Sequence, residues 1–191
     1  MDPTVSIALP AWLQGFLAAW RAPLHSDVQC MALAVALSRE NLLQGTGGPF
    51  GAVVLDSATG EWLGAGVNLV TSSGLSMAHA EIVALAMAQQ RLGDWHLGRE
   101  RSLTLASSCE PCAMCFGAVP WSGVRVLLCG ARKEDAEAAG FDEGDKPVAW
   151  IEALEVRGIQ VRRDLLRPEA ARVLADYRAA GGKIYNADEG S

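Results

Sequence analysis

The chain has 191 residues, half of them hydrophobic, and its formal net charge is −6 at pH 7. This length is typical of one domain with a substantial buried core. The acidic balance argues against a nucleic-acid partner, because contacts to phosphates require a basic surface.

The apolar segments of the chain do not resemble membrane spans. The longest of them, residues 7–20, is interrupted by Pro10, Gln14 and Gly15, so no membrane contact is predicted. The N-terminus lacks the basic region of a signal peptide. Three of the five cysteines stand in apolar stretches and are expected in the core: Cys30, Cys109 and Cys129. A reducing, cytoplasmic location suits such thiols.

Charge is distributed unevenly along the chain. Residues 1–150 carry nine basic and fifteen acidic side chains, whereas residues 151–191 carry seven of each. The second part contains a group of arginines interleaved with acidic residues: Arg157, Arg162, Arg163, Arg167, Arg172 and Arg178. Because the acidic neighbours dilute this group, we expect a solvated face rather than a phosphate-binding surface.

The N-terminal part predicts an extension, a helix and a hairpin. Residues 1–25 are expected to form the extension, and residues 27–43 predict a helix for which Ser26 is a suitable N-cap. Two strands are predicted next, at residues 51–56 and 61–70. Residues 57–60 between them have the composition of a hairpin turn.

Helices and strands alternate in the rest of the sequence. Helices are predicted at residues 78–92, from 112, and at 133–139, 148–155 and 168–180. Strands are predicted at residues 102–107, 124–129 and 159–162. This order predicts an α/β fold with parallel strands and helices on both faces, in which the hairpin is the antiparallel part. The predicted domain covers residues 26–180, and residues 181–191 form a C-terminal tail.

A split set of metal-binding residue types is the most specific feature of the sequence. His79 stands near Glu81, and Cys112 and Cys115 follow Pro111 later in the chain. One imidazole and two thiolates leave the fourth tetrahedral position of a zinc ion open for water, as in catalytic sites. The sequence therefore predicts one Zn²⁺ per chain, with a bound water or hydroxide, held by His79, Cys112 and Cys115. It does not decide which nitrogen of the imidazole binds.

The spacing places this zinc site between two helix starts. His79 is expected in the first turn of its helix, and Cys112 and Cys115 share one face of another helix, where Pro111 suits the first turn. A helix N-terminus favours a thiolate. Glu81 lies close enough to face the metal without binding it, and we predict that it transfers protons during catalysis.

Each half of this pattern has ordinary explanations when it stands alone. A His-x-Glu pair on a helix is common on surfaces, and a Cys-x-x-Cys pair can be structural or redox-active. A thioredoxin-like function leaves His79 and Glu81 unexplained. A non-catalytic zinc module has no need of Glu81. In this order the residues form the signature of zinc-dependent nucleobase deaminases.

Four stretches extend the resemblance beyond the metal ligands: GGPFGA at 47–52, AHAE at 78–81, SCEPCAMC at 108–115 and AAGFDE at 138–143. On these stretches the chain resembles the cytidine deaminase-like superfamily and, within it, the bacterial guanine deaminases. The first three occur in several purine and pyrimidine deaminases, whereas the fourth points to guanine. Glu143 departs from the aspartate that is often found in shorter relatives.

The resemblance implies a three-layer α/β/α sandwich with a five-stranded mixed sheet, and a homodimer. It implies that His79, Cys112 and Cys115 bind zinc and that Glu81 is catalytic. Asn68 would hydrogen-bond the base. Glu143 would read the guanine edge and assist departure of ammonia. The aromatic residues Phe50, Trp121 and Phe141 would form the pocket walls. Tyr185, in the C-terminal tail, would close the site of the same or the other subunit.

The expected reaction is hydrolysis of guanine to xanthine and ammonia, and a small nucleobase is the expected substrate. Independently of the resemblance, Asn68 offers both a donor and an acceptor, and an ionised Glu143 accepts from a ring N–H and an exocyclic amine. Three alternatives remain open: a tRNA adenosine deaminase, an aminohydrolase of another small ring such as cytosine, a pterin or ammeline, and a non-catalytic zinc module.

Overall fold

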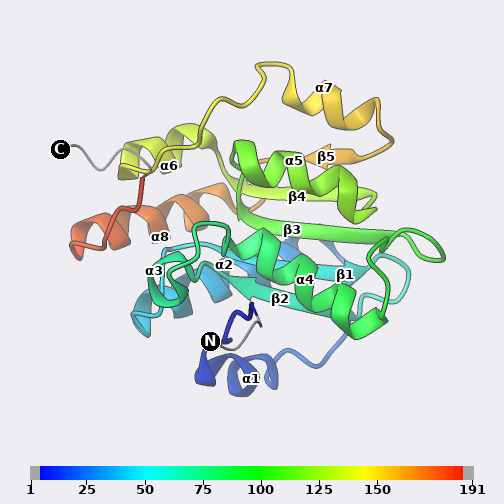
Figure 1. Ribbon diagram of the computed structural model, residues 1–191, viewed down its shortest axis with the longest axis horizontal. Helices are drawn as coiled ribbons and strands as arrows, with labels where there is room; N and C mark the ends of the chain where they lie inside the picture. Colours follow the sequence, from blue (N-terminus) through cyan, green and yellow to red (C-terminus); the bar gives the residue numbers. More distant parts are fainter. Residues whose placement is uncertain (1–4, 187–191) are drawn as a thin grey trace.

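The computed structural model describes residues 5–186, so the predictions for residues 1–4 and 187–191 lie outside the described residues. At its centre is a mixed five-stranded sheet with the strand order β2-β1-β3-β4-β5 (Figure 1). The strands are β1 (Gly51–Asp56), β2 (Trp62–Val67), β3 (Leu103–Cys109), β4 (Val126–Ala131) and β5 (Gln160–Arg162). β1 is antiparallel to both β2 and β3, and β3, β4 and β5 are parallel.

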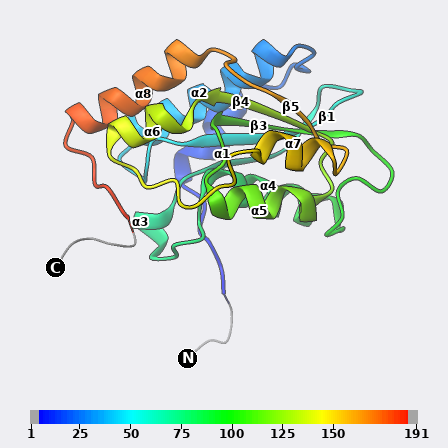
Figure 2. The same cartoon turned by 90° about the horizontal axis from the view of Figure 1, so that it is seen from above.

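The helices form layers on both faces of this sheet, as Figure 2 shows. The described helices are α1 (Ala11–Leu17), α2 (Asp27–Leu43), α3 (Val70–Ser73), α4 (Ala80–Leu92), α5 (Ala113–Ser122), α6 (Lys133–Ala139), α7 (Trp150–Glu155) and α8 (Arg167–Ala179). α2 and α8 pack on one face, whereas α4, α5 and α7 contribute to the hydrophobic core on the other. The predicted three-layer sandwich is therefore confirmed.

Burial on both faces explains the composition of β1. All six of its residues are buried. Val53 and Leu55 belong to the core beneath α2 and α8, whereas Ala52 and Val54 belong to the opposite core beneath α4. A strand covered on both sides reads as a continuous apolar run rather than an alternating one.

Two glycines let α4 approach the sheet closely. A Cβ atom at Gly64 or Gly66 of β2 would collide with the backbone carbonyl of Ala84 or Ala80. Small residues at such a contact allow a helix backbone to lie directly on a strand. This packing fixes the start of α4, which carries two of the predicted site residues.

The N-terminal extension contains a helix that the sequence pattern did not predict. α1 has only seven residues and includes Gly15, so its periodicity is weak. Leu13 and Leu17 are nevertheless buried in the main core. Trp62 of β2 donates a hydrogen bond from Nε1 to the carbonyl of Trp20 at 2.9 Å. The extension therefore covers the β2 edge of the sheet, which would otherwise expose unpaired backbone groups (Figure 1).

Other elements agree with the sequence to within a few residues. Ser26 caps α2 through a capping box with Gln29, as a serine at this position favours. The predicted strand at 61–70 is too long, because the chain turns into the short helix α3 after Asn68. Cys30, Cys109 and Cys129 are buried, as expected. No helix within residues 5–186 combines the length and the apolar character needed to cross a membrane.

Candidate metal centre and active site

The three predicted metal ligands meet at the N-terminal ends of two helices. His79 is the N-cap of α4 and Cys112 is the N-cap of α5, whereas Cys115 lies in the first turn of α5. The prediction that His79 lies within the first turn is therefore wrong by one position. Both caps have extended backbone angles, which turn their side chains toward each other across the gap between the helices.

The spacing of the donor atoms suits a tetrahedral zinc ion. The Nδ1 atom of His79 lies 3.5 Å from the Sγ atom of Cys112 and 3.6 Å from that of Cys115. Zinc bonds of about 2.0–2.1 Å to nitrogen and about 2.3 Å to sulfur at tetrahedral angles separate N and S by about 3.6 Å. The three side chains thus fit Zn²⁺, and the geometry selects Nδ1 as the ligand nitrogen.

The pKa values of the two cysteine thiols also suit a site that binds a cation. The pKa of Cys112 is lowered to about 4, first by the hydrogen bond from Cys115 and then, against burial, by His79. Cys115, the donor of that bond, has its pKa raised. Cys112 is therefore a thiolate at neutral pH, and a metal ion held by these ligands would also require Cys115 to lose its proton.

Glu81 is buried beside the ligands without being one of them. It lies in the first turn of α4, two residues after His79, and is only 6% exposed. Burial and the negative charge of Cys112 raise its pKa. A carboxyl group with a raised pKa beside a metal is suited to accept a proton and release it again.

Next to these residues lies a small pocket with several polar side chains in its lining. Among the described residues, three buried polar atoms that line it have no hydrogen-bond partner: Asn68 Nδ2, Glu143 Oε2 and Tyr185 Oη. Buried polar atoms without partners are rare in native proteins. Their convergence on one pocket indicates a polar ligand that supplies the missing bonds.

The orientation of the Asn68 side chain is fixed by a backbone amide two residues further along the chain. The amide of Val70 donates to Asn68 Oδ1 at 3.2 Å, so Nδ2 points into the pocket. Asn68 was expected to offer a ligand both a donor and an acceptor. Because Oδ1 already accepts from Val70, Nδ2 remains as the donor that faces the pocket.

Behind Asn68 stands a residue that sequence reasoning missed. Asn41 of α2 is fully buried, and its Nδ2 atom donates to the carbonyl oxygens of Gly48 at 2.7 Å and Asn68 at 2.9 Å. Its Oδ1 atom accepts from Thr46 at 2.5 Å. Asn41 thus joins the two backbone segments beside the pocket. The one feature of the sequence that could have indicated this role is the presence of a polar residue on the buried face of a helix.

Glu143 faces the metal ligands from the loop between α6 and α7. It is 5% exposed, and burial, followed by the charges of Cys112 and Glu81, raises its pKa to about 8. Lys146 opposes this shift. A zinc ion on the ligands would oppose it as well, since a cation favours the ionised carboxylate.

Aromatic rings form part of the pocket wall. The rings of Phe50 and Phe141 meet edge to face with their centroids 4.9 Å apart. Tyr185 packs on Phe141 at 5.3 Å and on His79 at 6.5 Å. These rings can hold a flat ligand between apolar faces.

Trp121, which was expected to form a pocket wall, does not line this pocket within the single chain. It lies six residues beyond Cys115 on α5 and is 80% exposed. Six positions carry a side chain nearly two turns along the helix and away from the face that bears Cys115.

The C-terminal segment is tied to the loop that carries Glu143. Asn186 accepts from the amide of Asp142 at 2.9 Å and donates to the carbonyl of Gly140 at 3.0 Å. Ile184 lies against Gly140. Within the single chain these contacts place Tyr185 in the pocket, and Asn186, which sequence reasoning missed, holds it there.

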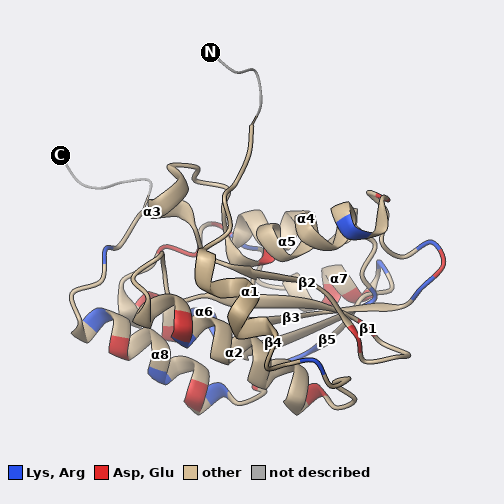
Figure 3. Ribbon diagram, turned by 90° about the horizontal axis from the view of Figure 1, so that it is seen from below, with Lys and Arg blue, Asp and Glu red and all other residues tan. Residues whose placement is uncertain are grey.

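The arginine group is not simply a solvated face. Basic and acidic residues alternate along α8 (Figure 3), and three of the six arginines pair with partly exposed carboxylates: Arg162, Arg167 and Arg172. Arg163 differs from these because its carboxylate partner is buried: its Nε atom donates at 2.6 Å to Glu110, whose side chain is only 2% exposed and which directly precedes the Pro-Cys motif. The expectation of a solvated face is therefore wrong for Arg163.

The fold and the metal centre together define a zinc-dependent deaminase. The chain belongs to the family described as the cytidine and deoxycytidylate deaminase zinc-binding region, whose model matches residues 24–131. The predicted superfamily is thereby confirmed.

More specific relatives share this architecture. The chain is 40% identical over 120 residues to the guanine deaminase of Bacillus subtilis (strain 168), covering 60% of this chain and 74% of the relative. A structure of guanine deaminase from Nitrosomonas europaea is 41% identical with a TM-score of 0.87, covering 94% of this chain and 98% of that one. A crystal structure of a complex with 2,6-diaminopurine is 43% identical with a TM-score of 0.88, covering 98% and 99%.

Proposed function

We propose that this chain is a guanine deaminase, which hydrolyses guanine to xanthine and ammonia. The observation that carries the proposal is the set of unpartnered polar atoms beside the metal ligands. Asn68 contributes a donor, Glu143 an acceptor and Tyr185 a hydroxyl group. The similarity to guanine deaminases supports the same substrate.

The polar atoms match the edges of guanine. An ionised Glu143 accepts hydrogen bonds from N1–H and from the 2-amino group, a donor pair that adenine lacks. Asn68 donates to an acceptor of the purine such as O6 or N7. Phe50 and Phe141 provide apolar contact for the ring.

In the proposed reaction a C2–O bond forms, the C2–N bond to the amino group breaks, and protons are redistributed. Zinc bound to His79, Cys112 and Cys115 would supply a water whose pKa is lowered to about 7. Glu81 takes the proton of the attacking water and delivers it to the adjacent ring nitrogen. Glu143, hydrogen-bonded to the amino group, assists transfer of the remaining proton from the C2 hydroxyl group to this amino group, which leaves as ammonia while the C2–O bond becomes a carbonyl.

The direct test is ammonia release from the purified protein with guanine, guanosine, adenine, cytosine, ammeline and a tRNA anticodon hairpin, with zinc content measured in parallel. We expect guanine to be the preferred substrate and xanthine the product. Deamination of adenosine in the hairpin without any reaction of guanine would replace the proposal by the tRNA-modifying alternative. Preference for cytosine or ammeline would indicate an aminohydrolase of a smaller ring.

Glu143→Gln is expected to weaken guanine binding and to lower turnover. The amide NH₂ would face a donor of the base inside a buried pocket, and such a mismatch costs about 1–3 kcal/mol in binding. Turnover should fall further because the amide cannot transfer a proton. Steady-state kinetics with guanine measure both effects. Asp145→Asn, an exposed change in the same loop, is the matched control and should behave like the parent.

Three finer properties belong to the same proposal. We propose one zinc ion and one attacking water per chain, because one cluster of three ligands is found among the described residues. We propose a homodimer, supported by Met114 and Trp121, which lie seven positions apart on one face of α5 and are 39% and 80% exposed. We propose a cytoplasmic role in guanine catabolism, since the ligand thiols require a reducing compartment.

A further inference from the structure

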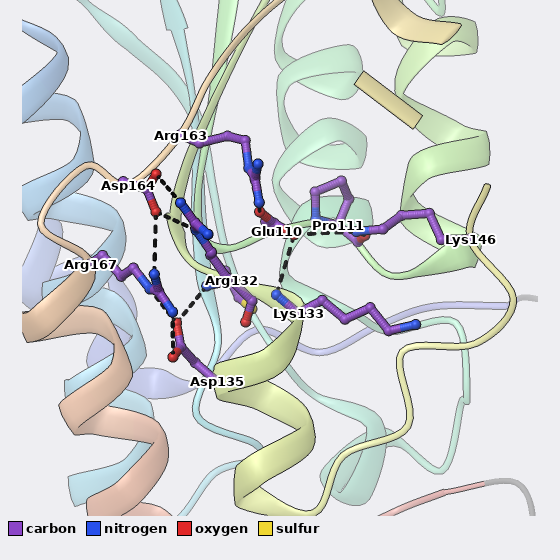
Figure 4. Close-up of polar contacts among 10 residues, drawn as sticks. Glu110, Pro111, Arg132, Lys133, Asp135, Lys146, Arg163, Asp164 and Arg167 are labelled. Carbon is purple, nitrogen blue, oxygen red and sulfur yellow. Dashed lines mark hydrogen bonds and ion pairs between the residues drawn. The ribbon is translucent and has the colours of Figure 1, made fainter. Parts of the chain in front are cut away.

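Lys146 is a buried lysine close to the active site. It follows Glu143 by three residues in the loop between α6 and α7, yet its side chain is only 2% exposed. Its Nζ atom donates to the carbonyl of Pro111 at 2.8 Å and lies 3.6 Å from Glu110 Oε2. It also stands 4.3 Å from the centre of the Trp150 ring. In Figure 4 the side chain reaches from its loop to the turn that precedes Cys112.

The partner of Lys146 is a carboxylate on which several elements converge. Glu110 Oε1 accepts from Arg163 at 2.6 Å, and Oε2 accepts from the backbone amide of Lys133 at 3.2 Å (Figure 4). Lys146 is therefore not needed to neutralise Glu110, because Arg163 already pairs with it. Burying an ammonium group costs free energy through lost hydration even when the group is paired and hydrogen-bonded, so this second cation calls for another explanation.

That explanation lies in the loop that Lys146 anchors. Between Gly140 and Ala149 the chain has no regular secondary structure, although it carries Phe141 and Glu143 into the pocket. The amide of Ala113 donates to the carbonyl of Glu143 at 2.9 Å, and beyond this bond Lys146 ties the loop to Pro111. Both contacts join the loop to the residues immediately flanking Cys112.

We infer that Lys146 is a positioning residue, which fixes the carboxylate of Glu143 relative to the metal ligands by tying its loop to the Glu110–Pro111 turn. This inference rests on the role proposed for Glu143. A loop without secondary structure is otherwise held by few bonds. Misplacement of a catalytic group by about 1 Å can reduce the rate by about 100-fold, so such a tie has a large effect on catalysis.

The test compares Lys146→Met with Lys133→Met. Both changes remove one ammonium group from the same region, but the side chain of Lys133 is 35% exposed and pairs with Glu137 on the surface of α6. We expect Lys146→Met to keep its zinc and to lower kcat/KM for guanine by about 10- to 100-fold. Lys133→Met should match the parent.

A double-mutant cycle separates positioning from general destabilisation. If Lys146 acts through Glu143, Lys146→Met should cause less than about a twofold loss in a Glu143→Gln background, because coupled effects are not additive. An equal loss in both backgrounds would overturn the inference. So would kinetics of Lys146→Met that match those of Lys133→Met.

Hydrogen–deuterium exchange provides a readout that does not depend on the substrate. Amides in residues 140–149 should exchange faster in Lys146→Met than in Lys133→Met, with α2 and α8 unchanged. Unchanged exchange in this loop would also contradict the inference. If guanine is not a substrate, the proposed function fails while this measurement still decides whether Lys146 holds the loop. Lys146→Gln, whose side chain is polar but neutral and shorter than lysine, is made in parallel in case the methionine variant does not fold. Because this variant loses the long ammonium tie to the Glu110–Pro111 turn, residues 140–149 should again exchange faster than in Lys133→Met.

Discussion

Glu81→Gln is expected to abolish most of the turnover while leaving the zinc site intact. Glutamine preserves the size and polarity of the side chain, and Glu81 is not one of the three metal ligands. Loss of general acid–base catalysis typically lowers the rate by about 10²- to 10⁴-fold. The burial and raised pKa of Glu81 suit this role. Ammonia release and zinc content, measured on the same preparation, test the two halves of the expectation.

The comparison for this variant is Glu61→Gln, a surface change at a glutamate that pairs with Arg91 and is 55% exposed. This control should retain the parental turnover. A Glu81→Gln enzyme within about threefold of the parent would show that the proton is transferred by another group. Loss of zinc in Glu81→Gln would instead show that the carboxylate supports the metal.

The metal centre was predictable because its information is local. His79 and Cys112 each begin a helix, and Cys115 is fixed relative to Cys112 by the first turn of α5. Close packing of α4 on β2 and of the strands on one another then brings the two helix starts together. The sequence could not choose between the imidazole nitrogens, because that choice depends on how the ring of His79 faces two thiols from another helix.

The fold was also predictable, because apolar strands alternate with helices along the sequence. The errors fall where tertiary contacts override local pattern. α1 is held by burial of Leu13 and Leu17 rather than by its own periodicity. β3 continues to Cys109, beyond the predicted end at residue 107, because Cys109 pairs with Ala131 of β4.

The supporting residues of the site could not be identified from the sequence. Asn41 hydrogen-bonds the backbone of Asn68, and Lys146 hydrogen-bonds the backbone of Pro111, so each contacts a residue distant in the chain. Neither residue belongs to a recognisable motif. Arg163 looked like a surface residue because its neighbours are charged, yet its partner Glu110 is buried. Polar side chains of this kind acquire their meaning only from the groups that they meet in the folded protein.

Cys112→Ala is expected to remove zinc and activity together. Two remaining ligands, His79 and Cys115, cannot complete the three-ligand set that a catalytic zinc requires. Cys112 is also the thiol whose pKa is lowered to about 4, so its loss removes one negative charge that attracts the cation. Metal analysis should find about one zinc ion per parental chain and far less in the variant.

Cys129→Ala controls for the general loss of a buried thiol. Cys129 is fully buried in the core beneath α4 and α5 and is not among the metal ligands. It should keep its zinc and its turnover, with only a modest loss of stability, because few atoms are removed from the core. A Cys112→Ala protein that retains full zinc and normal turnover would mean that another set of side chains holds the metal. Loss of both in Cys112→Ala but not in Cys129→Ala would tie the reaction to the two helix starts that this fold brings together.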